Sequence, residues 1–194
     1  AEKILPEILA DAPYYRRSGG GVTLSGGEIL GQADFARDLL EACKQSGLHT
    51  AVESTANAPF ETISRILPFL DLYLLDIKHM NSAKHKEYTG AGNELILENA
   101  KRLAESGVEL IIRTPVVPNF NDTPEEIRAI SKFAASLRGV KEHHLLPYHR
   151  LGQDKYSGLG RRYSLEGVEP PSKEKMEYLK ACAEECGLKC QIGG

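Results

Sequence analysis

The chain has 194 residues, of which 41% are hydrophobic and 26% charged, and its net charge is -3, as expected for one ordinary globular domain. It has no basic run long enough for a nucleic-acid surface, no apolar stretch long enough to span a membrane, and only four cysteines, too few for a disulfide framework. We therefore expect a cytoplasmic protein with neither a nucleic acid nor a membrane as partner.

Short apolar runs alternate with helical spacing along the chain. A short helix is expected within residues 1–17. Strands are expected at residues 21–24, 50–52, 72–75, 110–112 and 145–146, with a last one around Cys190. Helices are expected at residues 35–46, 59–70, 96–106, 124–137 and 176–186. The run at 72–75 does not alternate, which predicts a strand buried on both faces.

Strands that alternate with helices predict a parallel sheet with right-handed crossovers. The strands are too few to close an eight-stranded barrel. We therefore expect an α/β fold in which residues 18–194 form an open, partial TIM-like βα barrel. Residues 1–17 are expected to be a helical segment or a linker. A flat, doubly wound sheet is the alternative.

In parallel α/β proteins the ligand site lies beyond the carboxyl ends of the strands. A polar group follows each expected strand here, and any one of them alone is typical of a solvated strand end. Together they converge on one mouth with charges of both signs, which favours a zwitterionic small molecule. The candidate residues are Gly26, Gly27, Glu28, Glu53, Ser54, Asp76, Ile77, Lys78, Arg113 and His149.

Each group has a chemical task that its side chain suits. The glycine pair lets the backbone approach a ligand closely. Glu28 suits an ammonium group and Lys78 a carboxylate. Asp76 suits ribose hydroxyls or a cation. His149 suits a nucleoside, although a lone strand-end histidine is more often satisfied by backbone groups.

Cys182, Cys186 and Cys190 are spaced C-x-x-x-C-x-x-x-C, but no fourth ligand stands near them in the sequence. Buried thiols explain them better than a metal site. His143 and His144 are adjacent, so their side chains point to opposite faces of a strand and make a poor chelate. We expect no metal site in this chain.

Four ordered blocks carry a family resemblance: SGGGVTLSGGE at 18–28, LDIKHM at 75–80, IRTPVVP at 112–118 and LLPYH at 145–149. The chain resembles pyruvate formate-lyase activating enzyme and other activating enzymes of glycyl radical enzymes, in the radical S-adenosylmethionine superfamily. The resemblance implies a partial βα barrel, S-adenosylmethionine and a 4Fe–4S cluster.

The resemblance also implies roles by position. Gly27 would contact the methionyl amino group, and Asp76 and Lys78 would hold the ribose and carboxylate region. His149 would contact the nucleoside and Arg113 would lie in the active cavity. Glu53 stands where the family has an aspartate that helps to bind a monovalent cation.

One departure from the family is large. The chain contains no C-x-x-x-C-x-x-C cluster loop. In the family that loop and the first βα unit would precede Ala1. We therefore expect a portion that binds the cofactor without the cluster and that holds no catalytic residue.

The leading hypothesis is an oxidoreductase that activates a glycyl radical enzyme by reductive cleavage of S-adenosylmethionine and hydrogen abstraction from a backbone glycine. The family implies flavodoxin or ferredoxin as electron donor. One alternative is an ordinary α/β-barrel enzyme that binds a phosphorylated small molecule. Another is a non-catalytic binding remnant.

Overall fold

The computed structural model describes residues 3–150 and 165–193, and these residues build a single sheet of six parallel strands. The strand order follows the chain order, and each strand pairs in parallel with the next. The strands are β1 (Gly21–Leu24), β2 (His49–Ser54), β3 (Leu72–Asp76), β4 (Glu109–Val116), β5 (Glu142–Pro147) and β6 (Lys189–Ile192).

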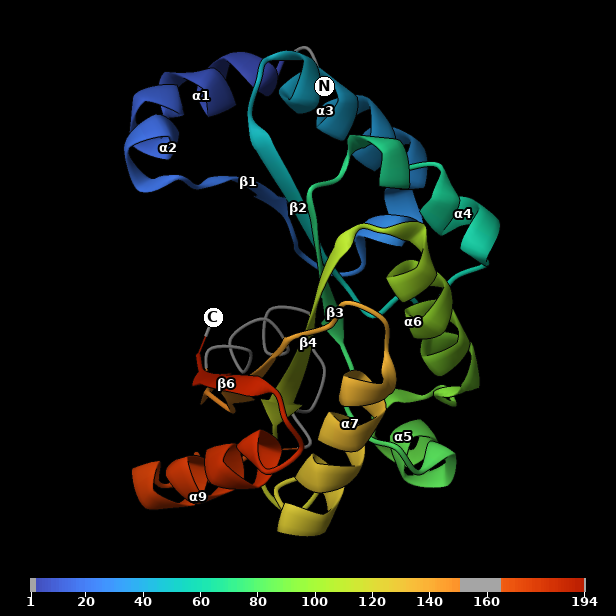
Figure 1. Cartoon of the computed structure of the whole chain (residues 1–194), viewed down its shortest axis with the longest axis vertical. Coiled ribbons are helices and arrows are strands. Elements are labelled where there is room, and N and C mark those ends of the chain that lie inside the picture. Colours follow the sequence, from blue (N-terminus) through green and yellow to red (C-terminus); the bar gives the residue numbers. More distant parts are fainter. Residues whose placement is uncertain (1–2, 151–164, 194) are drawn as a thin grey trace.

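Helices connect successive strands and lie along one side of the sheet (Figure 1). None of the helices within the described residues is long and apolar enough to cross a bilayer. The helices are α1 (Leu5–Ala10), α2 (Ala12–Ser18), α3 (Ala33–Gln45), α4 (Phe60–Ser64), α5 (Ser82–Thr89), α6 (Glu94–Ser106), α7 (Pro124–Ser136) and α9 (Lys173–Glu184), with short 3-10 turns η1 (Ile29–Gln32) and η2 (Leu67–Phe69).

The strand order decides between the two expected architectures. A doubly wound sheet reverses its strand order at a switch point, and this sheet does not. Among the described residues β1 and β6 are not paired with each other, so the barrel stays open. The open partial barrel is confirmed, and the flat doubly wound alternative is wrong.

The two faces of the sheet differ in burial. Tyr73 and Leu75 of β3 are fully buried on the helix-covered face, whereas Leu72 and Leu74 on the inner face are only half-buried. The expectation that β3 is buried on both faces was wrong, because helices cover only one side of an open barrel. Because Leu72 and Leu74 on the inner face are also apolar, the sequence of β3 does not alternate between polar and apolar residues.

The helices also depart from the expected pattern in three places. α5 was not expected, and α2 follows α1 within the N-terminal segment. The helix expected at residues 59–70 is broken into α4 and η2, with Pro68 inside η2. Ala12 of α2 packs in a buried cluster with Val22 of β1 and Leu39 of α3, so the N-terminal segment lies against the sheet.

Close approach of two strands explains a glycine at the start of β1. Gly21 pairs with His49 of β2, and a Cβ on Gly21 would collide with the backbone carbonyl of His49. A side chain at this position would therefore push β1 away from β2.

We predict that Gly21→Ala lowers the free energy of unfolding by about 1–3 kcal/mol, because the methyl group overpacks a backbone contact. The matched control is Gly31→Ala, where a Cβ meets no atom within 4 Å. Chemical denaturation measures both variants, and an equal effect of the two substitutions would contradict the steric explanation.

The adjacent histidines of β5 face opposite sides of the sheet, as expected. His143 is buried, with Nε2 2.9 Å from Thr114 Oγ1 and Nδ1 3.0 Å from Ser131 Oγ. Its neighbour His144 is paired with Glu142 on the other face, with 3.0 Å between His144 Nε2 and Glu142 Oε2. Burial lowers the pKa of His143 to about 3, and the neighbouring His144 acts in the same direction.

This depressed pKa predicts a pH dependence of stability. The unfolded chain binds a proton at His143 near pH 6.5 and the folded chain does not. The contribution of His143 to the free energy of unfolding is therefore fully present above that pH. It falls as pH drops toward about 3, with a slope approaching about 1.4 kcal/mol per pH unit. Denaturation between pH 7 and pH 5 should show this component in the parent and in His144→Gln. It should be missing in His143→Gln, and an undiminished slope there would refute the assignment.

Candidate functional site

Charged side chains from three neighbouring strands meet at the carboxyl edge of the sheet. Glu53 at the end of β2 forms an ion pair with Arg113 of β4, with 3.1 Å between Glu53 Oε2 and Arg113 Nη1. The same carboxylate oxygen accepts a hydrogen bond of 3.1 Å from Ser25 Oγ in the loop after β1. Asp76 pairs in register with Arg113, which brings β3 into the same group.

Asp76 carries the charge that is least satisfied by the protein. Its Oδ2 lies 3.3 Å from Lys78 Nζ, and its side chain is 13% exposed. Its other oxygen, Oδ1, is buried without a hydrogen-bond partner among the described residues, as is Nε of Arg113. Burial raises the pKa of Asp76, and the charges of Lys78 and Arg113 oppose that rise only in part.

Two adjoining cavities open above these groups and share Glu53 and Lys78. A polar one of about 240 Å³ lies over the loops after β1 and β2 and also touches Asp76. A wider one of about 520 Å³ has mainly apolar walls. The apolar lining includes Pro115, Val117, Phe120, Leu146 and Tyr148, and His149 lines the same cavity. The mouth thus suits a ligand with a charged, polar end and a larger apolar part.

The aromatic wall of the wider cavity was not predicted from the sequence. Tyr88 of α5 stacks on Phe120, with ring centroids 4.2 Å apart, and Tyr88 Oη donates to the carbonyl of Asn119 at 3.2 Å. α5 has almost no amphipathic pattern, so periodicity gave no signal for it. Tyr88 and Phe120 are far apart in the chain, and only the fold brings them together.

Glu28 is placed differently from the other acidic groups. Its Oε2 accepts from Thr55 N at 3.1 Å and from Thr55 Oγ1 at 2.7 Å. Its Oε1 accepts from Ser54 Oγ at 2.6 Å and from Leu30 N at 3.2 Å. Burial opposes ionisation, but these hydrogen bonds outweigh it and lower the pKa of Glu28. Glu28, which the sequence suggested as a partner for an ammonium group, therefore has both carboxylate oxygens hydrogen-bonded to the protein.

Two further candidates, Ser54 and Ile77, are buried. Ser54 is buried, and its Oγ accepts from Ala56 N at 3.0 Å while it donates to Glu28. The Ile77 side chain is 1% exposed, and its backbone N–H donates to Arg113 O at 2.9 Å. Ser54 lines the polar cavity, whereas the Ile77 side chain belongs to the buried core.

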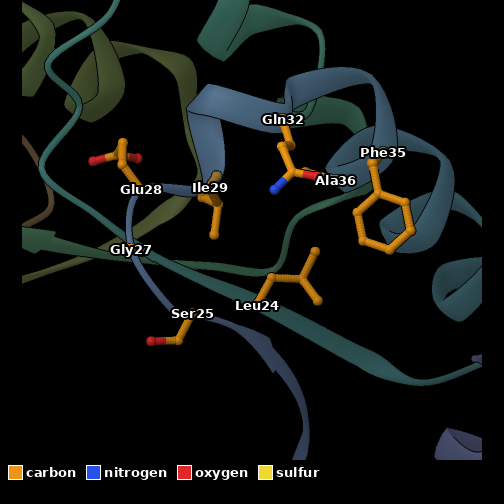
Figure 2. A pocket seen from close by; sticks show the side chains of 8 residues that line it. All are labelled: Leu24, Ser25, Gly27, Glu28, Ile29, Gln32, Phe35 and Ala36. Carbon is orange, nitrogen blue, oxygen red and sulfur yellow. The ribbon is translucent and has the colours of Figure 1, made fainter. Parts of the chain in front are cut away.

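A third cavity, of about 250 Å³, lies beside the loop after β1 (Figure 2). Leu24, Ile29, Phe35 and Ala36 make the apolar half of its lining. Figure 2 shows the carboxylate of Glu28 turned away from Leu24 and Phe35. This cavity shares Ser25, Gly27 and Glu28 with the polar cavity, but the charged groups of the mouth do not line it.

The cysteines do not assemble into a metal centre. The described residues hold no group of three or more His, Cys, Asp or Glu side chains that could bind a metal ion. Cys182 lies in α9 and Cys190 in β6, both buried, and burial raises the pKa of Cys190 to about 12. These thiols pack the far end of the sheet.

Comparison with known sequences gives consistent results. The family model of the radical SAM superfamily matches residues 2–134. The chain is 46% identical over 169 residues to the (2S)-3-sulfopropanediol sulfolyase activating enzyme of Bilophila wadsworthia, covering 86% of the chain and 56% of the relative. It is 38% identical over 190 residues to the pyruvate formate-lyase 1-activating enzyme of Escherichia coli, covering 97% and 77%. The chain spans only 56% to 62% of the length of three such relatives.

Solved structures agree with the fold. A domain of pyruvate-formate lyase-activating enzyme from Bacteroides vulgatus superposes with a TM-score of 0.75 at 35% identity, covering 90% of this chain and 99% of that one. Streptococcus suis SuiB bound to S-adenosylmethionine superposes with a TM-score of 0.66 at 17% identity, covering 89% and 38%. The second likeness concerns the fold alone.

The contrast between two aspartates makes a prediction about stability. Asp71 accepts from Thr50 N at 2.9 Å and pairs with Lys44. Burial tends to raise the pKa of Asp71, but its partners lower it overall. We expect Asp71→Asn to destabilise the fold by about 1–3 kcal/mol. Asp76→Asn should leave stability unchanged within about 0.5 kcal/mol or raise it, because the buried charge is poorly paired. Thermal and urea denaturation at pH 7 measure both, and a large loss in Asp76→Asn would show that this carboxylate is structural.

Proposed function

The chain belongs to the radical SAM superfamily and, within it, to the activating enzymes of glycyl radical enzymes, and from this membership we propose that it binds S-adenosylmethionine at the carboxyl edge of its sheet. We further propose that the whole protein uses this ligand to activate a glycyl radical enzyme. The single observation that carries the proposal is the charged mouth formed by Glu53, Asp76, Lys78 and Arg113.

The unpartnered atoms at the mouth support this ligand. S-adenosylmethionine presents an ammonium, a carboxylate, a sulfonium and a ribose diol. Asp76 Oδ1 is a buried acceptor without a partner, and Arg113 Nε is a buried donor without one, in the part of the chain that is described. Buried polar atoms are normally hydrogen-bonded, so a ligand that brings both donors and acceptors would complete this set.

The glycine pair supports a close backbone contact. Gly26 has φ of 137°, a conformation that favours glycine, and a Cβ on Gly26 or Gly27 would meet no protein atom within 4 Å. Both glycines line the polar cavity. In the proposal their backbone approaches the methionyl end, Lys78 holds the carboxylate, and Asp76 accepts from hydroxyl groups.

The apolar cavity suits the nucleoside. Its walls of Pro115, Val117 and Phe120 would exclude water from the adenine, and exposed His149 at the rim would contact the nucleoside side. Asp76 also interacts electrostatically with Glu53. Because Glu53 is paired with Arg113 and Asp76 with Lys78, we assign no site here to the monovalent cation that the family implies.

When bound and reduced, S-adenosylmethionine supplies a 5'-deoxyadenosyl radical that abstracts a hydrogen atom. The described residues include no set of cysteines that fits a 4Fe–4S cluster, so we assign no electron-transfer step to them. The residues of this chain bind and orient the ligand, and none is proposed as a catalytic acid or base.

The protein partner is inferred from the relatives. Their names describe activating enzymes for a sulfopropanediol sulfolyase, a choline trimethylamine-lyase and a pyruvate formate-lyase. We propose a glycyl radical enzyme as protein substrate and flavodoxin or ferredoxin as electron donor. A phosphorylated small molecule is disfavoured, since Glu53 and Asp76 would repel a phosphate at the same mouth.

The ligand can be tested by titration calorimetry on the chain. We expect S-adenosylmethionine to bind weakly, and Asp76→Ala and Lys78→Ala each to weaken binding by at least about tenfold, because each removes a partly buried charge partner. The matched control is Lys189→Ala, which removes an exposed lysine paired with Glu142 at the opposite end of the strands. Its affinity should equal that of the parent.

Inorganic phosphate is the competing probe. Tighter binding of phosphate than of S-adenosylmethionine, with loss of that binding in Lys78→Ala, would overturn the proposal. It would move the protein to the phosphate-binding class.

A further inference from the structure

The carboxylate of Glu28 joins two loops that carry the proposed ligand site. Glu28 follows Gly26 and Gly27 directly, and it receives three hydrogen bonds from Ser54 at the end of β2 and from Thr55, the first residue of the loop that follows. A fourth comes from Leu30 N at the start of η1. Four donors on one carboxylate leave little capacity for a ligand.

The loop after β2 is held from its other side as well. Ala56 adopts a left-handed backbone conformation with φ of 55°, which is strained for a residue with a side chain. Asn99 of α6 donates from Nδ2 to the carbonyls of Ala56 at 2.7 Å and Ala58 at 2.8 Å. Glu28 and Asn99 together fix a turn that would otherwise relax, and this turn begins one residue after Glu53.

We propose that Glu28 is a positioning residue, which locks the glycine loop after β1 to the Ser54–Thr55 turn and does not itself contact the ligand. The inference rests on the proposed function, because the two loops carry Gly27 and Glu53 of the S-adenosylmethionine site. Figure 2 shows the Glu28 side chain leaving the loop on the side away from Leu24 and Phe35. Glu28 also lines the polar cavity, but donors from the protein already occupy both of its carboxylate oxygens.

A positioning role and a ligand role respond differently to removal of the charge. A glutamine at position 28 keeps one oxygen that can accept both donors of Thr55. The hydroxyl of Ser54 can rotate to accept from the new amide, so only the bond from Leu30 N is lost outright. If Glu28 instead paired with an ammonium group of the ligand, Glu28→Gln would remove the negative charge as fully as Glu28→Ala.

The first measurement is amide hydrogen exchange by NMR on the chain without ligand. We expect Glu28→Ala to speed exchange at Thr55 and Leu30 by at least about tenfold, because each amide loses its acceptor. Glu28→Gln should keep protection at Thr55 and lose it at Leu30. Ser172→Ala is the matched control, since Ser172 caps α9 by accepting from Lys175 N, and it should leave both amides protected.

The second measurement is the affinity for S-adenosylmethionine. We expect Glu28→Ala to weaken binding by at least about tenfold and Glu28→Gln by no more than about threefold. Thr55→Val removes the hydroxyl that donates to Glu28 at 2.7 Å and that accepts from Asn57 N at 3.3 Å. It should weaken binding, as Glu28→Ala does, because Thr55 holds the Glu28 carboxylate. It also provides a second variant if Glu28→Ala does not fold.

Two results would overturn the inference. Unchanged protection of Thr55 in folded Glu28→Ala would show that the carboxylate does not hold the turn. Equal losses of affinity in Glu28→Gln and Glu28→Ala would make Glu28 a charge partner of the ligand. If the parent chain fails to bind S-adenosylmethionine, the proposed function fails, and the exchange measurement alone then decides whether Glu28 locks the loops.

Discussion

The register between β3 and β4 is the constraint on which the site depends. It places Asp76 beside Arg113 on the inner face of the sheet, where helices do not cover them. The same register places Leu75 beside Ile112 on the other face, and both are fully buried. A shift of one residue would bury the charges and expose the apolar core, so the core fixes the position of the charged groups.

The protein satisfies the carboxylates of Asp71 and Glu28 better than that of Asp76, which faces the proposed ligand site. Asp71 and Glu28 have both oxygens engaged, and their pKa values are lowered although burial acts the other way. Asp76 keeps a buried oxygen without a described partner, and burial raises its pKa. A fold retains such a poorly compensated charge at a cost in stability, which is the pattern expected where a ligand completes the hydrogen bonding.

Local chemistry read from the sequence was correct where neighbours in the chain decide it, and incomplete where distant groups compete. Thr123, with Glu126 three residues later, has the spacing of a capping box, and its side chain accepts from Glu126 N at the start of α7. The Glu126 side chain does not complete a capping box, because it accepts instead from the backbone of Met80, which is 46 residues away in the chain. Glu28 shows the same competition: its charge suggested a contact with a ligand, and Ser54 Oγ at the end of β2 and Thr55 N donate to the same carboxylate.

The sequence by itself determined the class of fold, the family and the set of polar groups that follow the strands, because these depend on periodicity and on short blocks of adjacent residues. Only the tertiary structure decided which of those groups face a cavity, which brace a loop, and which aromatic residues form the wall. Tyr88 and Phe120 meet through α5, which has no apolar stripe, so no pattern in the chain marks their contact. The physical reason is that hydrogen bonds and ring contacts between residues far apart in the chain depend on the relative positions of their backbone segments, which the whole sheet determines.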